Sequence, residues 1–485
     1  METQYGNAVW KRSMGTSIVD FHRVVYPRTF GGTVAHRADR ENAPRRGSRD
    51  GARRAASAPF LFPRGMLRCP RDSGSSRAFV RSTRTKAFPM FRMSRASRFA
   101  CAVVCGIAAM KDGGARMAAG GDDPGRLVLI GTYAEPSADG IHVLRLDETT
   151  GALTRVSAMG GVKNPSFLAI HPSGRFVYAV SEMGGDDGKR TGAVAAFAFN
   201  AQTGTLERLN TRPSGGNGPC HVGLDRTGTC LVVANYGSGS VSAIPIVADG
   251  RLGTPGSPVQ HEGSSVTDRQ KGPHAHSIHV APDGRYVIAA DLGLDKLLVY
   301  RIDPRTATLA PNDPPFTSTA PGAGPRHFAF HPKGDKAYVI NELDSTITVL
   351  DYDATGGRLH AKQTVSTLPE GLSLSGSNST AEVQVHPTGR FVYGSNRGHD
   401  SVAVFSVNEA SGELTLVGHQ STGGKTPRNF GIDPSGRFLL AANQASNNVV
   451  VFRLDPSTGM PVPAGHEATI ERPVCVKFVN IEGGR

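Results

Sequence analysis

Tryptophan is nearly absent from this 485-residue chain, because the only one is Trp10. Repeats of the WD type carry a tryptophan in their signature, so that type is disfavoured. The Gly-x-Ser-x-Gly nucleophile elbow of serine hydrolases is also missing, as is a glycine-rich phosphate loop. The chain therefore lacks the short motifs that are typical of a catalytic triad or of a nucleotide-binding site.

Cysteine is scarce and scattered. The six positions are Cys69, Cys101, Cys105, Cys220, Cys230 and Cys475. No pair has the CxxC spacing of a zinc site, and the number is too small for a disulfide framework in a chain of this length. We expect buried, reduced thiols in a cytoplasmic protein.

Acidic residues are scarce in the first hundred positions, which carry 21 Lys or Arg against 6 Asp or Glu. The remainder carries 33 against 35, so the formal charge of +13 arises in the N-terminal segment. We expect residues 1–123 to form a disordered basic tail, which is a targeting segment, a functional arm or the result of a start codon placed too early. The near-neutral remainder has no basic footprint for nucleic acid.

Long apolar runs are absent from the tail. The run that follows Met93, in MSRASRFACAVVCGIAAM, has only about twelve apolar residues and is too short to span a bilayer. It loosely resembles a secretory signal, which is the alternative to a cytoplasmic location if Met93 is the true start. We expect no membrane partner.

A repeat fills the chain from about residue 126 onward and returns at intervals of 46 to 56 residues. Its clearest piece is a Pro-x-Gly turn followed by an apolar run, as in HPSGRFVY (171–178), HPKGDKAY (331–338), HPTGRFVY (386–393) and DPSGRFLL (433–440). A second turn, as in TTGALTRV (149–156) and ASGELTLV (410–417), occurs seven times. The sequence therefore contains seven units.

Each unit holds four short β-type runs and no segment of helical period, which predicts a four-stranded antiparallel sheet. Seven such sheets arranged radially make an all-β, seven-bladed β-propeller, predicted here for residues 124–485. The last unit ends after one run, 472–479, while two unmatched runs, 126–133 and 140–146, stand at the front. We expect the N- and C-terminal strands to share one blade and close the ring. A β-helix is the alternative, but its turns are shorter and its strands are parallel.

Aligning the units on the turn glycine gives each strand position a column of equivalent residues. Six positions before the glycine stand Leu168, Val222, Ile278, Phe328, Val383, Phe430 and Val476. Four positions before it stand Ile170, Leu224, Val280, Phe330, Val385, Ile432 and Phe478. Both columns are wholly apolar, as in strands that pack against the next blade, so we expect them to be core.

Other columns are irregular and ionisable. Seven and eight positions before the glycine stand Cys220-His221, His276-Ser277, Arg326-His327, Ala381-Glu382 and Arg428-Asn429. The next strand ends at Glu342 in one unit and Arg397 in another. Antiparallel neighbours bring the start of one strand beside the end of the next, and the ring brings all units to one mouth. We therefore expect a site there.

The same residues carry a resemblance to a known family. GPHAHSIHVAPDGRYV (272–287), GAGPRHFAFHPKGDKAYVINEL (322–343), AEVQVHPTGRFVYGSNRGHDSVAVF (381–405) and TPRNFGIDPSGRFLLAANQASNNVVVF (426–452) resemble the seven-bladed propeller lactonases. That family includes propeller-type 6-phosphogluconolactonases and carboxymuconate-lactonising enzymes. The resemblance covers about residues 126–480, and the basic tail has no counterpart in it. Family membership therefore leaves the reaction open, and our hypothesis is the metal-independent hydrolysis of 6-phosphogluconolactone, in the pentose phosphate pathway, or of a related sugar lactone.

Lactone hydrolysis needs a base for water, donors for the carbonyl oxyanion and a cation for any substrate phosphate. As catalytic residues we predict Glu382, His276 or His327 as the base, with Arg326. As substrate-binding residues we predict His221, His274, Arg397, Arg428, Asn429 and Glu342. Arginine forks suit carboxylate and phosphate alike, so the sequence leaves the substrate's phosphorylation open.

We expect no cofactor and no metal. His274 and His276 form an i, i+2 pair that can ligate a metal, but the neighbouring arginines oppose a dication. The partner is a small-molecule lactone, and the oligomeric state is open. Two alternatives remain: a cycloisomerase that moves a proton during ring closure, and a non-catalytic propeller that binds a partner.

Overall fold

The computed structural model describes residues 125–184, 192–372 and 376–480. The predicted disordered tail of residues 1–123 and the signal-like run after Met93 lie outside the described residues. Where the chain is described it forms 28 strands and one short 3-10 helix, Asp268–Gln270. No helix in these ranges is both long and apolar enough to cross a membrane.

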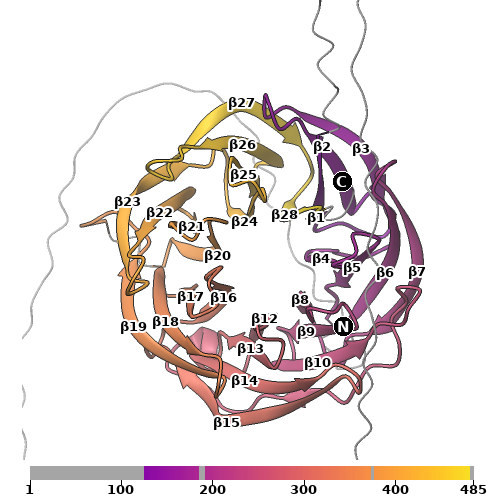
Figure 1. Ribbon diagram of the computed structural model, residues 1–485, viewed down its shortest axis with the longest axis vertical. Coiled ribbons are helices and arrows are strands. Elements are labelled where there is room, and N and C mark those ends of the chain that lie inside the picture. Colours follow the sequence, from indigo (N-terminus) through magenta and orange to yellow (C-terminus); the bar gives the residue numbers. More distant parts are fainter. Residues whose placement is uncertain (1–124, 185–191, 373–375, 481–485) are drawn as a thin grey trace, which may run out of the picture. The chain divides into compact units, whose positions relative to one another are not determined.

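The strands form seven sheets of four, arranged around one axis (Figure 1). The first blade contains β28 (Pro473–Phe478), β1 (Arg126–Thr132), β2 (Ile141–Leu146) and β3 (Leu153–Met159). The second contains β4 (Leu168–Ile170), β5 (Phe176–Ser181), β6 (Ala193–Asn200) and β7 (Thr205–Pro213). The third contains β8 (Pro219–Leu224), β9 (Cys230–Asn235), β10 (Ser240–Pro245) and β11 (Val259–Gln260).

The remaining four blades follow in chain order. The fourth contains β12 (Ala275–Val280), β13 (Tyr286–Asp291), β14 (Lys296–Asp303) and β15 (Thr308–Ser318). The fifth contains β16 (Pro325–Phe330), β17 (Lys336–Asn341), β18 (Thr346–Asp353) and β19 (Arg358–Ser366). The sixth contains β20 (Ser379–Val385), β21 (Phe391–Arg397), β22 (Ser401–Val407) and β23 (Leu414–Ser421). The seventh contains β24 (Pro427–Ile432), β25 (Phe438–Asn443), β26 (Asn448–Leu454) and β27 (Pro461–Thr469).

This architecture confirms the predicted seven-bladed β-propeller. All strand pairs within the blades are antiparallel, and each blade places its first strand nearest the axis (Figure 1). The ring closes as expected, because β28 pairs with β1 from Val128 opposite Phe478 to Thr132 opposite Pro473. One blade is thus built from both ends of the repeat region.

The apolar columns pack between blades, but not equally. Every member of the column six positions before the turn glycine is at most 2% exposed. Full burial of such a side chain stabilises the fold by about 1.5–3 kcal/mol. The column four positions before the glycine is only half-buried throughout, which differs from the expectation of a closed core. These residues lie at the ends of the inner strands, and five of the seven line a cavity there.

Candidate active site

Six of the seven inner strands carry a β-bulge near their start. The register slips between Pro219 and His221, Ala275 and Ser277, Pro325 and His327, Thr380 and Val383, and Pro427 and Asn429, and in β28 opposite Gly131 and Thr132. A bulge adds one unpaired residue and re-aims the side chains beside it. Cys220, His276, Arg326 and Arg428 occupy these bulges, and all four line one end of the channel.

The bulged residues surround a small hollow. Its other walls are Tyr133, Ser166, Phe167, Glu182, His327 and Val474. Its volume of about 10 Å³ is close to the space that one water molecule needs. We call this end of the channel the arginine mouth, after Arg269, Arg326, Arg397 and Arg428.

Glu342 holds three of the four arginines. Its carboxylate lies 2.9 Å from Arg326 Nε, 2.9 Å from Arg397 Nη2 and 3.1 Å from Arg269 Nη2. Arg326 also donates from Nη1 to the Ala381 carbonyl, and Arg397 donates from Nη2 to the Thr380 carbonyl. These contacts fix the positions of the buried guanidinium groups.

The charges in this cluster are set by burial and by one another. Burial alone would raise the pKa of Glu342, but Arg397 and Arg326 outweigh it and lower the pKa to about 2. Burial lowers the pKa of Arg397 to about 9, although Glu342 opposes the shift. At neutral pH the carboxylate and the guanidinium groups are therefore all charged, and Glu342 offsets part of the positive charge.

Arg428 differs from the other three arginines. No carboxylate or carbonyl of the described residues accepts a hydrogen bond from its guanidinium, which stacks instead on the Tyr133 ring, 5.4 Å from its centroid. Tyr133 donates to Glu182 at 3.2 Å, and burial raises the pKa of Tyr133 to about 12, so its hydroxyl stays protonated. The polar N–H groups of Arg428 remain available to a ligand.

Glu382 lies one layer deeper, behind His327. The two residues share a hydrogen bond of 3.0 Å between His327 Nδ1 and Glu382 Oε2. Asn429 also donates to Glu382 Oε2, while its own Oδ1 accepts the Val476 amide at 2.8 Å. Burial raises the pKa of Glu382 to about 7, although Lys477 and Arg326 act against the rise. With Nδ1–H directed at the carboxylate, His327 keeps a lone pair on Nε2.

His276 is a second neutral imidazole, in the same layer as Arg326 and Arg428. Burial and the nearby Arg326 keep its pKa well below the usual value. The Cys220 thiol donates to the His276 carbonyl at 3.2 Å, and its sulfur lies 3.8 Å from His276 Nδ1. The sulfur can therefore accept a hydrogen bond from Nδ1–H, and in this tautomer Nε2 keeps its lone pair. Burial raises the pKa of the Cys220 thiol, so it is not a thiolate nucleophile.

Two other predicted residues lie apart from the hollow. His274 stands at the rim, stacked on Tyr236 with ring centroids 4.6 Å apart and its Nδ1 3.0 Å from the Tyr236 carbonyl. His221 lies deeper, 4.1 Å from the Phe167 ring centroid, and accepts the Ile278 amide on Nδ1. It lines the opposite end of the channel instead of the arginine mouth.

Within residues 125–184, 192–372 and 376–480, no three His, Cys, Asp or Glu side chains converge on a point that could hold a metal ion. His274 and His276 have different surroundings. The ring of His274 stacks on Tyr236, whereas His276 Nδ1 lies 3.8 Å from the Cys220 sulfur. Cys220, Cys230 and Cys475 are buried free thiols. Cys69, Cys101 and Cys105 lie outside the described residues.

The sequence comparison of repeats missed two residues at this mouth. Tyr133 is the counterpart of Glu342 and Arg397, but β1 precedes the first turn glycine and so could not be aligned on it. Arg269 belongs to the loop between β11 and β12, which the other units do not repeat. Counting back from the second turn does not recover Tyr133 either, because it lies 18 residues before Gly151, whereas Glu342 and Arg397 each lie 15 residues before Gly357 and Gly412.

The fold and this mouth define a propeller enzyme with a polar, arginine-rich channel end. Residues 127–478 match the family described as "Lactonase, 7-bladed beta-propeller". The chain belongs to this family, and it is a lactonase that acts on a small molecule.

Several relatives support this assignment. The 6-phosphogluconolactonase of Bacillus subtilis is 38% identical over 301 residues, which cover 62% of this chain and 83% of that protein. The 6-phosphogluconolactonase of Formosa agariphila is 33% identical and covers 62% and 85%, respectively. The structure of a periplasmic gluconolactonase from Pseudomonas aeruginosa has a TM-score of 0.69 at 34% identity and covers 74% of this chain and 99% of that one. The relatives thus differ in substrate phosphorylation.

Proposed function

We propose that the protein hydrolyses 6-phosphoglucono-1,5-lactone to 6-phosphogluconate without a metal ion, as a cytoplasmic step of the pentose phosphate pathway. One observation carries the proposal: an unpaired guanidinium, Arg428, and neutral imidazoles surround a hollow the size of one water molecule. The names of the Bacillus and Formosa relatives favour the phosphorylated substrate.

In the proposed reaction the water in the hollow attacks the lactone carbonyl carbon while His276 Nε2 accepts its proton. Arg428 donates to the carbonyl oxygen, which becomes negatively charged as the tetrahedral intermediate forms. The bond to the ring oxygen then breaks, and the imidazolium returns the proton to that oxygen. The product is an open-chain acid, which loses a proton to solvent at neutral pH.

His327 is the alternative base. Its Nδ1–H points at Glu382, so a carboxylate would stabilise the imidazolium that forms during proton transfer. Glu382 does not line the hollow, so it contacts the site only through His327. Its proposed role is therefore to orient and charge-stabilise that ring, with Asn429 holding it in place.

We assign the substrate phosphate to the rim of the mouth. The Arg269 side chain is 56% exposed and donates from Nη2 to the Tyr236 hydroxyl at 3.1 Å. His274 stacks on the same tyrosine. A phosphate on the far end of the lactone would meet this guanidinium, whose planar fork suits phosphate oxygens.

The function is tested by assaying the full chain on 6-phosphogluconolactone, gluconolactone and carboxymuconate. We expect the highest kcat/KM on 6-phosphogluconolactone, with chelator present throughout. A preference for gluconolactone would overturn the phosphate assignment, and turnover of carboxymuconate alone would make the protein a cycloisomerase. An absence of turnover on all three substrates would overturn the proposal.

Replacing Arg428 tests the oxyanion role. We expect Arg428→Gln to lower kcat/KM by about 10²–10³-fold, the usual effect of losing one oxyanion donor. Arg437→Gln is the matched control, because Arg437 is exposed and lies near Glu148, away from the mouth. Equal activity of the two variants would contradict the role.

A further inference from the structure

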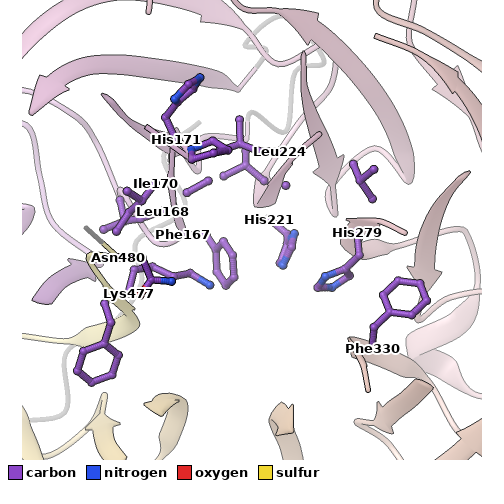
Figure 2. Close-up of a pocket in the computed structure, with 16 residues that line it drawn as sticks. Phe167, Leu168, Ile170, His171, His221, Leu224, His279, Phe330, Lys477 and Asn480 are labelled. Atoms are coloured by element: carbon purple, nitrogen blue, oxygen red, sulfur yellow. The ribbon is translucent and has the colours of Figure 1, made fainter. Parts of the chain in front are cut away.

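A second, larger cavity lies at the opposite end of the channel, where the Pro-x-Gly turns connect the inner strands to their neighbours (Figure 2). Its volume is about 420 Å³, within the range of small-molecule sites and far above that of the arginine mouth. Residues from β4, β8, β12, β16 and β28 line it. We call it the turn-side cavity.

One fixed positive charge faces this cavity. Lys477 of β28 lies with Nζ 4.3 Å from the Phe167 ring centroid, and none of the lining residues is acidic. No carboxylate of the described residues forms an ion pair with Lys477. Glu382 is close enough for Lys477 to influence its pKa, but its carboxylate bonds His327 and Asn429.

The fold itself does not require a lysine at this position. Five positions before the turn glycine, the equivalent residues of the other blades are Ala169, Gly223, His279, Ala329, Gln384 and Gly431. Most of these are small, and only His279 and Lys477 are ionisable. The two share the turn-side cavity.

Two imidazoles line the same cavity as the lysine. His279 Nε2 is buried and has no hydrogen-bond partner among the described residues. Burial and Lys477 lower the pKa of His279 to about 4, so the ring is neutral at pH 7. The His221 ring centroid lies 4.6 Å from that of His279, and because His221 Nδ1 accepts the Ile278 amide, its Nε2 carries the proton. Figure 2 shows both rings at the cavity, with Phe167 next to His221 and Phe330 next to His279.

The rest of the wall is apolar. Ile170, Leu224, Val280 and Phe330 belong to the half-buried column and line the cavity. Their incomplete burial leaves apolar surface that a ligand can cover. The cavity therefore combines one ammonium group and neutral donors with an apolar surface.

We propose that the turn-side cavity binds a small organic monocarboxylate, with the carboxylate on Lys477 Nζ and the organic body against the apolar side chains of the cavity wall. A single ammonium balances one negative charge, whereas a phosphate dianion would call for the arginine forks found at the other mouth. Phe167 is the one lining residue that this cavity shares with the hollow of the arginine mouth, and the proposal does not depend on the lactone chemistry there.

The test uses benzoate, titrated calorimetrically into the full-chain protein without any lactone. We expect saturable binding that weakens about tenfold or more in Lys477→Met, a change that keeps the length of the side chain. Lys333→Met is the control. Lys333 lies in the Pro-x-Gly turn that follows β16, pairs with Glu409 at 2.8 Å and does not line the cavity. Thermal unfolding of each variant verifies that it is folded.

A crystal structure of the wild-type protein with benzoate locates the ligand whether or not the variants fold. Density for benzoate beside Lys477 supports the proposal. Benzoate at the arginine mouth alone, or affinity unchanged in a folded Lys477→Met, overturns it. Tighter binding of inorganic phosphate than of benzoate at Lys477 would overturn the assigned ligand class.

Discussion

At the scale of single residues, the four arginines of the arginine mouth differ in the groups that they contact. Arg269, Arg326 and Arg397 all contact Glu342, and the buried carboxylate offsets their charge. Arg428 stacks on the face of Tyr133 and has no hydrogen-bond or ion-pair partner among the described residues. The N–H groups of Arg428 that face the hollow are free to donate, which supports the oxyanion role proposed for it.

The pH dependence of turnover identifies the base. His276 has a pKa well below 6.5, so with His276 as the base kcat/KM is expected to stay constant from about pH 6 to 8. If His327 is the base, the rate should instead rise with pH through about 7, because the Glu382 carboxyl, whose pKa is raised to about 7, must lose its proton to stabilise the imidazolium. The measurement is kcat/KM against pH after subtraction of spontaneous lactone hydrolysis.

Variants separate the same two possibilities. We expect His276→Gln to lower kcat by about 10²-fold or more, and His327→Gln to have a smaller effect. A sigmoidal profile centred near pH 7 together with a greater loss in His327→Gln would contradict the choice of His276.

At the scale of elements, turns connect neighbouring blades through histidine. His331 accepts the Lys333 amide on Nδ1 and lies with Nε2 3.1 Å from the Gly389 carbonyl in the next blade. His171 and His386 make the same contact to Gly228 and Gly436. Gly389 has a φ of +77°, and a Cβ there would collide with the His331 ring, so the glycine serves both the turn and the contact.

Removing one of these contacts has a measurable cost. We expect His331→Ala to lower the free energy of unfolding by about 1–3 kcal/mol, because a buried carbonyl loses its donor. His360→Ala is the control, since His360 is exposed on β19. Urea denaturation measures both changes, and a loss for His331→Ala no greater than that for His360→Ala would show that the turns do not depend on this bond.

The sequence predicted the elements well, for a physical reason. The apolar columns recur in all seven units, and each copy predicts the same packing. The closing pair β28–β1 follows from the unmatched runs at the two ends of the repeat region. The arrangement of the site was harder to predict, because positions counted from the turn glycine do not reveal where a strand bulges. The bulges separate Arg326 and His276 at the mouth from Glu382 and His221 in the layer below.

At the scale of the whole molecule, a ring depends on its closing contact. Val476 on β28 is 2% exposed and packs with Ile130 and Leu440 in one apolar cluster. Asn429 Oδ1 accepts its amide, so β28 joins β1 and β24 at once. The last strand therefore bridges the first and seventh blades.

Disrupting that bridge should affect the entire ring. We expect Val476→Asp to lower the free energy of unfolding by several kcal/mol and to cause aggregation, because an unpaired carboxylate would be buried between blades. Val462→Asp is the control, as Val462 lies on the outer strand β27 and is 54% exposed. Thermal unfolding and size-exclusion chromatography compare the two. Similar stability would mean that the ring tolerates an open first blade.

The shared first blade also sets an order of events during synthesis. β1 is made before every other strand of the ring, yet its partner at the axis, β28, is made after all of them. Until then β1 exposes an unpaired edge of the kind that invites pairing with other chains. The channel lacks Val474 at one end and Lys477 at the other during the same interval. A nascent chain with six finished blades thus still has an open ring and an unpaired edge, and the last strand to be made closes both.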